Sequence, residues 1–311
     1  MREYTIADDQ RIWSEVEAFA LAEMLPESFT KSFMQWQVFV VERLAALANR
    51  ASLPPLVGLS GCQGCGKSTV ARIFGRLLER VHGLNTAVLS LDDFYLTQSE
   101  RASLANSLHP LFETRGVPGT HDIDLLQQTL QELRIGSGKV RLPRFDKASD
   151  DRTKLELCPL FSAPAQIILL EGWCVGVPPQ AKSQIEEPIN DLEAKCDPEG
   201  VWRNEVNRQL ANAYGEVFTS LDMLMLFQAP SFDVVFDWRW EQEHRLATSF
   251  LRDHPDESDP TMTQTQVGEF VLYYQRLTEH ALSTLPQISD YTWELARDRS
   301  VCSFRERGLA T

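Results

Sequence analysis

Short apolar segments alternate with longer stretches of helical periodicity along most of the chain. The segments are LVGLS at 56–60, TAVLSL at 86–91, QIILL at 166–170, MLMLF at 223–227 and YTWEL at 291–295. The first four lack strict apolar–polar alternation, as expected of strands buried on both faces of a parallel sheet. Helices between them would cover both faces. The pattern therefore predicts a doubly wound α/β fold with a mostly parallel five-stranded sheet flanked by helices.

Helical periodicity also occurs before the first predicted strand and again near the end of the chain. Residues 1–50 are predicted to form a helical extension, and one helix face is marked by Phe33, Trp36, Val40, Leu44 and Leu47. A late helix is predicted after Thr263, which precedes Gln266 at capping-box spacing. The inner face of that helix consists of Val267, Phe270, Val271, Tyr274 and Leu277. No linker divides the rest, so 51–311 is predicted to be one domain.

Composition narrows the classes of partner. The chain has 311 residues, 43% of them hydrophobic, which is enough for a substantial core, and a formal net charge of −14. Excess acid argues against a nucleic-acid or anionic-membrane surface, so an anionic small molecule would need a local basic cluster. No apolar run approaches ~18 residues, and six irregularly spaced cysteines suggest reduced thiols in a cytoplasmic protein. The acidic segment 178–200 is predicted to be a surface insertion, and the acidic segment 253–260 is predicted to be a loop.

GCQGCGKST at 61–69 carries the most specific short motif in the chain. It follows an apolar strand and precedes a helical stripe, which is the arrangement of a phosphate-binding P-loop. Its glycines would let backbone N–H groups converge on ATP phosphates, with Lys67 reaching the β/γ-phosphates and Ser68 binding Mg²⁺. The predicted nucleotide-binding residues are Gly61, Cys62, Gln63, Gly64, Cys65, Gly66, Lys67, Ser68 and Thr69.

The same stretch contains Cys62 and Cys65 in CxxC spacing. A zinc site needs about four ligands, and the sequence has no second CxxC or HxxxH pair. A disulfide between the two thiols would distort the loop. We therefore expect both to be small loop residues, with inhibition by thiol oxidation as the alternative.

Accessory motifs distinguish kinases from other P-loop proteins. The nearest match to a guanine-specifying motif, TKLE at 153–156, ends in Glu rather than Asp. The third strand ends QIILLEGW, where Glu171 is followed by Gly, a form that suits a small-molecule kinase with Glu171 supporting Mg²⁺ through water. The second strand ends SLDDFYL, which places Asp92 and Asp93 beside the predicted phosphate-binding loop. Asp92 is the predicted base and also a predicted metal ligand; capping of a loop is the alternative.

These motifs resemble the P-loop kinase group of uridine kinase, phosphoribulokinase and bacterial pantothenate kinase, and within it plant-type D-glycerate 3-kinase. The matching pieces cover most of residues 54–300 in family order. They are GCQGCGKST (61–69), SLDDFYL (90–96), TRGVPGTHD (114–122), LPRFDKASDDR (142–152), IILLEGWCVGV (167–177) and WRWEQEHRL (238–246). The resemblance implies ATP-dependent phosphorylation of D-glycerate to 3-phosphoglycerate.

The resemblance also implies an acceptor site and a lid. The expected acceptor-binding residues are Asp92, Tyr95, Arg115, His121, Asp122, Arg144, Lys147 and Glu171, with Asp146 and Arg152 nearby. An ordinary surface pair of Lys147 with Asp150 or Asp151, and a structural role for His121, are the alternatives. In the lid region 236–260, Arg239 and Arg245 would close over the phosphates; otherwise Trp238 and Trp240 anchor an ordinary helix.

Two rival functions stay open at the level of sequence. One is a kinase for another hydroxylated metabolite, such as a nucleoside, a pantothenate-like compound or a sugar phosphate. The other is an ATP-binding regulatory protein without transfer activity. The sequence leaves monomer and homodimer open.

Overall fold

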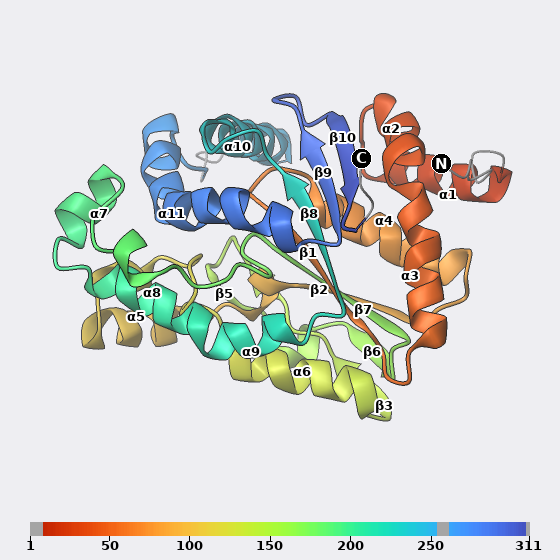
Figure 1. Cartoon of the computed structure of the whole chain (residues 1–311), viewed down its shortest axis with the longest axis horizontal. Helices are drawn as coiled ribbons and strands as arrows, with labels where there is room; N and C mark the ends of the chain where they lie inside the picture. Colours follow the sequence, from red (N-terminus) through yellow and green to blue (C-terminus); the bar gives the residue numbers. More distant parts are fainter. Residues whose placement is uncertain (1–8, 254–260, 309–311) are drawn as a thin grey trace.

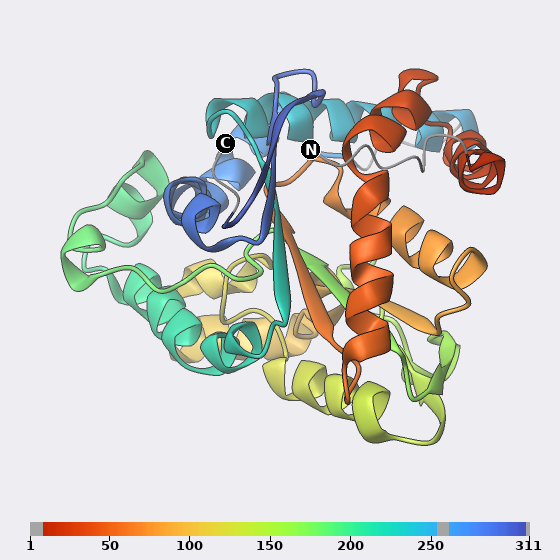
Figure 2. The ribbon, with the colours of Figure 1, turned by 45° about the vertical axis from the view of Figure 1, so that its right-hand side comes forward.

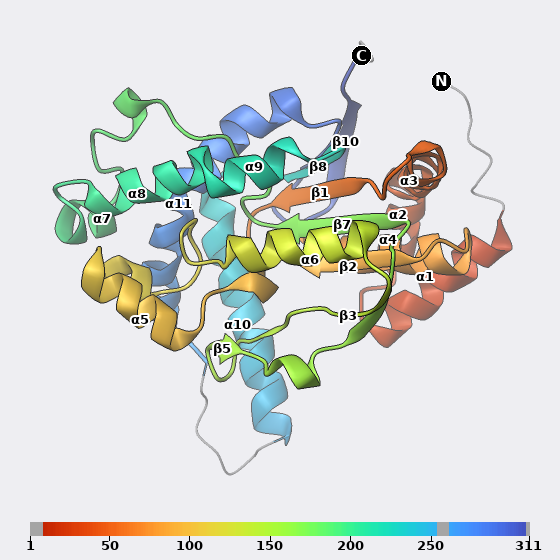
Figure 3. The same cartoon turned by 90° about the horizontal axis from the view of Figure 1, so that it is seen from below.

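The five predicted strands form one sheet. The computed structural model describes residues 9–253 and 261–308. The strands are β1 (Leu56–Gly61), β2 (Thr86–Ser90), β7 (Ile167–Gly172), β8 (Met223–Gln228) and β9 (Tyr291–Leu295). They are parallel and lie in the order β9-β8-β1-β7-β2 (Figure 1). Their carboxyl ends therefore meet at one edge, and β1 and β7 point toward the side that carries α5 (Gln98–Ser107) (Figure 3).

A sixth strand, β10 (Val301–Glu306), corrects the prediction of a five-stranded sheet. It pairs antiparallel with β9 and forms an edge of the sheet. Its sequence, VCSFRE, mixes apolar and polar residues and is only partly buried. The strand forms by backbone pairing with β9. Because its sequence has no apolar run, the hydrophobic pattern did not predict it.

Helices cover both faces of the sheet, as the doubly wound prediction requires (Figure 2). On β7, Ile167 and Leu169 enter the core beneath α4 (Lys67–Arg80) and the N-terminal helices. Ile168 and Leu170 point to the opposite core, because successive side chains on a strand alternate between faces. That second core is closed by α6 (Ile123–Ile135), α8 (Val201–Ala211), α9 (Ala213–Thr219) and part of α11 (Gln264–Ile288).

Two short antiparallel pairs lie outside the main sheet. β3 (Gly138–Arg141) pairs with β6 (Leu160–Ala163) at the amino ends of β2 and β7, where Asn85 bonds the Ser162 and Pro164 carbonyls. The hairpin of β4 (Phe145–Asp146) and β5 (Asp151–Arg152) lies at the carboxyl edge. The other helical elements are α7 (Asp191–Cys196), α10 (Asp233–Asp253) and the 3-10 turns η2 (Leu91–Phe94), η3 (Pro110–Glu113), η4 (Leu155–Leu157) and η5 (Lys182–Gln184). No helix in the described ranges is long and apolar enough to cross a membrane.

The N-terminal segment forms three helices, where the sequence predicted one continuous apolar face. They are α1 (Gln10–Ala22), α2 (Ser28–Trp36) and α3 (Val38–Arg50). The chain leaves helical geometry at Gln37, so Phe33 lies on α2 and Leu44 on α3. Both side chains are nevertheless fully buried, and the Phe33 ring lies 5.8 Å from that of Phe74 on α4. The buried faces of α2 and α3 therefore both contribute to the core next to α4, although the chain is not one continuous helix.

The predicted capping box is present at the start of α11, where Thr263 and Gln266 exchange hydrogen bonds. By contrast, residues 178–200 are not solvated throughout. Glu193 and Asp197 are buried there, paired with Arg276 of α11 and Arg203 of α8. Composition predicted a solvated insertion because it does not reveal the distant cations that pair with these acids. Most of the acidic loop predicted at 253–260 lies outside the described residues.

Candidate active site

The phosphate loop joins β1 to α4 and requires glycine for two different reasons. Gly66 precedes the helix with a φ of 92°, in the left-handed region that glycine adopts without a steric penalty. Gly64 also has a positive φ, and a Cβ there would lie 2.7 Å from the Cβ of Trp238 on α10. The loop therefore leads into the positive end of the α4 dipole while α10 packs closely against it.

Lys67, Ser68 and Glu171 converge at the start of α4. The Ser68 hydroxyl donates to Glu171 Oε1 at 2.8 Å, and Lys67 Nζ lies 3.9 Å from Glu171 Oε2. Burial is the largest single influence and would lower the pKa of Lys67, but Glu171, Cys65 and Asp92 together outweigh it and raise that pKa. The ammonium group is therefore charged, and a hydroxyl and a carboxylate oxygen stand next to it. Oxygen donors of this kind suit Mg²⁺, which takes only one or two protein carboxylates alongside phosphate oxygens.

Asp92 lies in η2, directly after β2, and its two oxygens have different partners. Lys147 Nζ donates to Oδ2 at 2.8 Å, and the Tyr95 hydroxyl donates to Oδ1 at 3.1 Å. Burial alone would raise the pKa of Asp92, but Lys147, with help from Lys67, lowers it below its ordinary value. Asp92 is thus ionised. The partner of Lys147 is Asp92, not Asp150 or Asp151 as the surface-pair alternative required.

The neighbouring Asp93 faces a different environment. Arg144 donates to Asp93 Oδ2 at 3.0 Å, and the Phe145 N–H donates to Oδ1 at 3.2 Å. Burial raises the pKa of Asp93 to about 6, against the opposing effect of Arg144. Asp93 therefore holds the β4–β5 hairpin against η2 through its bonds to Arg144 and to the Phe145 N–H.

His121 and Tyr95 form a stacked pair beside Asp92. Their backbones make an antiparallel bridge, and their ring centroids are 4.3 Å apart. His121 Nδ1 lies 2.7 Å from the Tyr214 hydroxyl on α9. Burial lowers the pKa of His121 to about 3, so the ring is neutral.

The remaining predicted acceptor residues are not all brought to the same point. Arg115 pairs with Asp150, which also pairs with the buried Arg101. Arg152 bonds Glu100 and Asp122, and Asp122 caps the start of α6 through the Leu125 N–H. The exposed Asp146 bonds the backbone and hydroxyl of its own turn. Asp122, Asp146 and Arg152 are therefore already engaged in local structure, which sequence alone did not show.

Residues 236–253 of the predicted lid region lie on α10, which begins before the predicted boundary at 236; residues 254–260 lie outside the described residues. Arg239 pairs with Glu243 and its guanidinium lies 5.6 Å from the Phe270 ring centroid. Arg245 is exposed and pairs with Glu241. Trp238 is buried against the phosphate loop, as the anchoring alternative supposed. In this structure both lid arginines are held by carboxylates of their own helix.

Three residues that sequence reasoning missed position these elements. Arg299, in the β9–β10 turn, donates to the Gly64 carbonyl at 2.8 Å. Trp173 Nε1 donates to the Gly116 carbonyl at 3.0 Å, and the Tyr274 hydroxyl donates to the Arg115 carbonyl at 3.1 Å. The two latter bonds hold the RGVPG segment beside the site. Trp173 falls within the quoted segment 167–177, but no local motif indicates these contacts, because each side chain bonds backbone that is distant in sequence.

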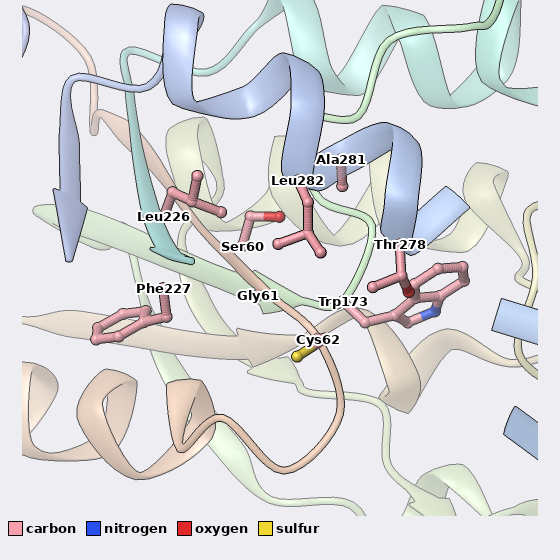
Figure 4. A pocket seen from close by; sticks show the side chains of 9 residues that line it. All are labelled: Ser60, Gly61, Cys62, Trp173, Leu226, Phe227, Thr278, Ala281 and Leu282. Carbon is pink, nitrogen blue, oxygen red and sulfur yellow. The ribbon is translucent and has the colours of Figure 1, made fainter. Parts of the chain in front are cut away.

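A small cavity of about 10 Å³ lies behind the phosphate loop (Figure 4). It is lined by Gly61 and Cys62 of the loop, by Trp173, and by the hydroxyl-bearing Ser60 and Thr278. It is too small for a metabolite. Asp92 and Lys147 do not line this cavity, and both side chains are partly exposed.

The two loop cysteines are free and buried. A hydrogen bond from Cys62 lowers the pKa of Cys65 to about 7, whereas the same bond and burial raise the pKa of Cys62. Within the described residues no group of His, Cys, Asp and Glu is arranged to hold a metal ion by itself. Both cysteines lie within the phosphate loop.

Comparison with known proteins agrees with this geometry. Residues 56–186 match the family described as phosphoribulokinase / uridine kinase. The uncharacterized kinase mug58 of Schizosaccharomyces pombe is 32% identical over 241 residues, which cover 75% of this chain and 82% of that protein. The chloroplastic D-glycerate 3-kinase of Arabidopsis thaliana is 28% identical over 75% of this chain, which spans about half (49%) of that protein.

A solved structure has the same fold. The D-glycerate 3-kinase from Cryptococcus neoformans var. grubii superposes with a TM-score of 0.68 at 23% identity, covering 86% of this chain and 99% of that chain. The P-loop α/β prediction is thereby confirmed. Since the phosphate loop, the sheet and the sequence matches agree, the chain belongs to the phosphoribulokinase/uridine kinase family and is an ATP-dependent kinase.

Proposed function

We propose that this kinase phosphorylates D-glycerate to give 3-phosphoglycerate. The observation that carries the proposal is the position of Asp92, an ionised carboxylate beside both Lys67 and Lys147. A hydroxyl bound there would face the phosphate loop on one side and cationic groups on the other. Two similar proteins bear the name D-glycerate 3-kinase, which favours this acceptor over other small anions.

In the proposed reaction the acceptor hydroxyl oxygen forms a bond to the γ-phosphorus while the bond to the β-phosphate oxygen breaks. ADP leaves, and the hydroxyl proton passes to Asp92. The transition state of such transfers is loose, so a carboxylate of low pKa suffices as the proton acceptor. Lys67 would neutralise charge on the β/γ-phosphates, and closure of α10 would bring Arg239 and Arg245 toward them.

Mg²⁺ would be held by Ser68, with Glu171 and Asp92 acting directly or through water. When bound, the ion neutralises phosphate charge. The contact between Ser68 and Glu171 at 2.8 Å fits this assignment, because one carboxylate then orients the hydroxyl ligand. Residues 61–69 are proposed to wrap the nucleotide phosphates.

On the acceptor side, Arg115, Arg144 and Lys147 are the proposed cations for the glycerate carboxylate. Each is paired with a carboxylate of the chain, so an incoming carboxylate would compete with Asp150, Asp93 or Asp92. Tyr95, His121 and Asp122 would complete the wall of the proposed acceptor site. A mostly cationic site favours a small anion over a nucleoside, which would need aromatic and amide contacts to its base.

An ADP-release screen tests the substrate. The acceptors are D-glycerate, L-glycerate, uridine, pantothenate and ribulose 5-phosphate, and the position of the phosphate on the product is read by NMR. We expect turnover with D-glycerate and phosphorylation at the 3-hydroxyl. Turnover with uridine or pantothenate but not glycerate would overturn the acceptor assignment and leave the kinase assignment intact.

Asp92→Asn tests the mechanism. The change should reduce kcat by roughly 10²-fold or more while leaving ATP affinity nearly unchanged, the usual scale for loss of a proton acceptor. Asp124→Asn, at an exposed position on α6, is the matched control and should retain full activity. Unchanged turnover in Asp92→Asn would remove the proposed base. ATP binding without turnover on any acceptor in the wild type would favour the regulatory alternative.

The cytoplasmic location and the homodimer stay predictions.

A further inference from the structure

His121 occupies a fixed position beside Asp92, and only one of its ring nitrogens has a partner among the described residues. Residues 94–96 and 120–122 pair through two backbone hydrogen bonds, Leu96 N–H to Thr120 O and Asp122 N–H to Phe94 O. This pairing holds the His121 ring against Tyr95. Nδ1 contacts the Tyr214 hydroxyl, whereas Nε2 is buried and has no hydrogen-bond partner.

The contacts of Tyr214 determine which nitrogen carries the proton. The Gly119 backbone N–H donates to the Tyr214 oxygen at 3.0 Å, and a backbone N–H can only donate. If Nδ1 also donated to that oxygen, the Tyr214 proton would have no acceptor and Nε2 would lack a donor. If Tyr214 donates to Nδ1, only the N–H at Nε2 is left to satisfy. Each buried group without a partner is destabilising, so the second arrangement, which leaves one such group instead of two, is favoured.

We propose that Tyr214 holds His121 in the neutral tautomer protonated at Nε2, and that this N–H donates a hydrogen bond to the reacting hydroxyl of the acceptor. The second half of the proposal rests on the proposed function, which puts that hydroxyl beside Asp92. Tyr214 is then a positioning residue that acts through His121, and the buried Nε2–H gains its partner only when the acceptor binds.

The arrangement has a chemical consequence for the acceptor. A hydroxyl can donate its proton to Asp92 and accept a hydrogen bond from His121 at the same time, which fixes its orientation before attack. A neutral N–H orients the oxygen with less withdrawal of electron density than a cation would cause. The site consequently selects an acceptor with a hydroxyl at this point and discriminates against an analogue that lacks it.

Imidazole ¹⁵N NMR on the full chain tests the tautomer without reference to activity. The His121 resonances are assigned by their absence from His121→Gln. We expect an unprotonated Nδ1 and a protonated Nε2 in the free protein, and a shift of the Nε2–H signal when the best acceptor from the ADP-release screen is added. A protonated Nδ1 overturns the tautomer assignment. An Nε2–H signal unchanged at saturating acceptor overturns the donor role, whichever acceptor the screen identifies.

Variants test the same contacts by kinetics. Tyr214→Phe should lower kcat/KM for the acceptor by roughly tenfold, the scale of one hydrogen bond, with KM for ATP unchanged. Tyr273→Phe, which removes a hydroxyl bonded to Thr114, is the control and should behave as wild type. His121→Gln keeps an N–H donor near the position of Nε2 and should retain more activity than His121→Phe. Equal activity of these two variants at equal melting temperature, or a normal Tyr214→Phe, would refute the proposal.

Discussion

The guanidinium of Arg299 donates a hydrogen bond to the carbonyl oxygen of Gly64, 2.8 Å away, across 235 positions of sequence. The same side chain pairs with Glu241 at 2.6 Å and lies over the Trp238 ring. Arg299 has a φ of 69°, an uncommon conformation for a residue with a side chain. One strained residue in the β9–β10 turn thus joins the phosphate loop to α10.

Arg299→Ala should weaken ATP binding. Removal of the donor leaves the Gly64 carbonyl unsupported, and hydrogen bonds to charged groups are worth about 1.5–3 kcal/mol. We expect KM for ATP to rise about tenfold, with a smaller change in KM for the acceptor. The control is Arg297→Ala, in the same turn, which breaks an exposed pair with Asp237 on α10. Equal KM values for ATP in the two variants would exclude the loop-positioning role.

Glu171→Gln should make activity more dependent on Mg²⁺. The change removes the carboxylate that accepts from Ser68 and neutralises Lys67, so metal affinity or activity should fall by about 10- to 100-fold. Raising the Mg²⁺ concentration should recover part of the loss, as measured by initial rates over a Mg²⁺ series. Glu199→Gln, at an exposed site, serves as the control. A wild-type Mg²⁺ dependence in Glu171→Gln would contradict the metal assignment.

The reactivity of Cys65 should depend on pH around neutrality. Only the thiolate reacts with alkylating reagents, and the hydrogen bond from Cys62 lowers the pKa of Cys65 to about 7. The alkylation rate should therefore rise through pH 7 and level off above it, followed by peptide mass spectrometry between about pH 5.5 and 9. Cys62→Ala should move the midpoint upward, and ATP should slow the reaction. A wild-type midpoint near the ordinary thiol value, about 8.5, would contradict this prediction.

Glu193→Ala should destabilise the fold strongly. Glu193 and Arg276 are both buried, and removal of the carboxylate leaves an uncompensated guanidinium, at a cost of about 3–5 kcal/mol. Denaturant unfolding measures the loss. Asp191→Ala removes the acid of an exposed pair with Lys195 in the same helix and should change stability little. Equal stability of the two variants would show that the Glu193–Arg276 pair is not buried in solution.

The sequence predicted those parts of the molecule in which each residue type serves a local need. Apolar segments identified five strands, and glycine spacing identified the phosphate loop before Lys67 and Ser68. The same local logic placed Asp92 at a strand end and Thr263 at a helix start. These features depend on periodicity and on short-range hydrogen bonding, which neighbouring residues determine.

Other features depended on contacts between distant segments. Sequence indicated neither the antiparallel strand β10 nor the break at Gln37, because strand pairing and packing on α4 decide them. The separate partners of Asp92 and Asp93 likewise arise from the β4–β5 hairpin folding back over η2. The sequence by itself determined the P-loop α/β fold and the chemical types at the site. Only the tertiary structure decided which charges are paired, which are buried and which buried polar groups have no partner among the described residues, because these properties depend on the distances between residues remote in sequence.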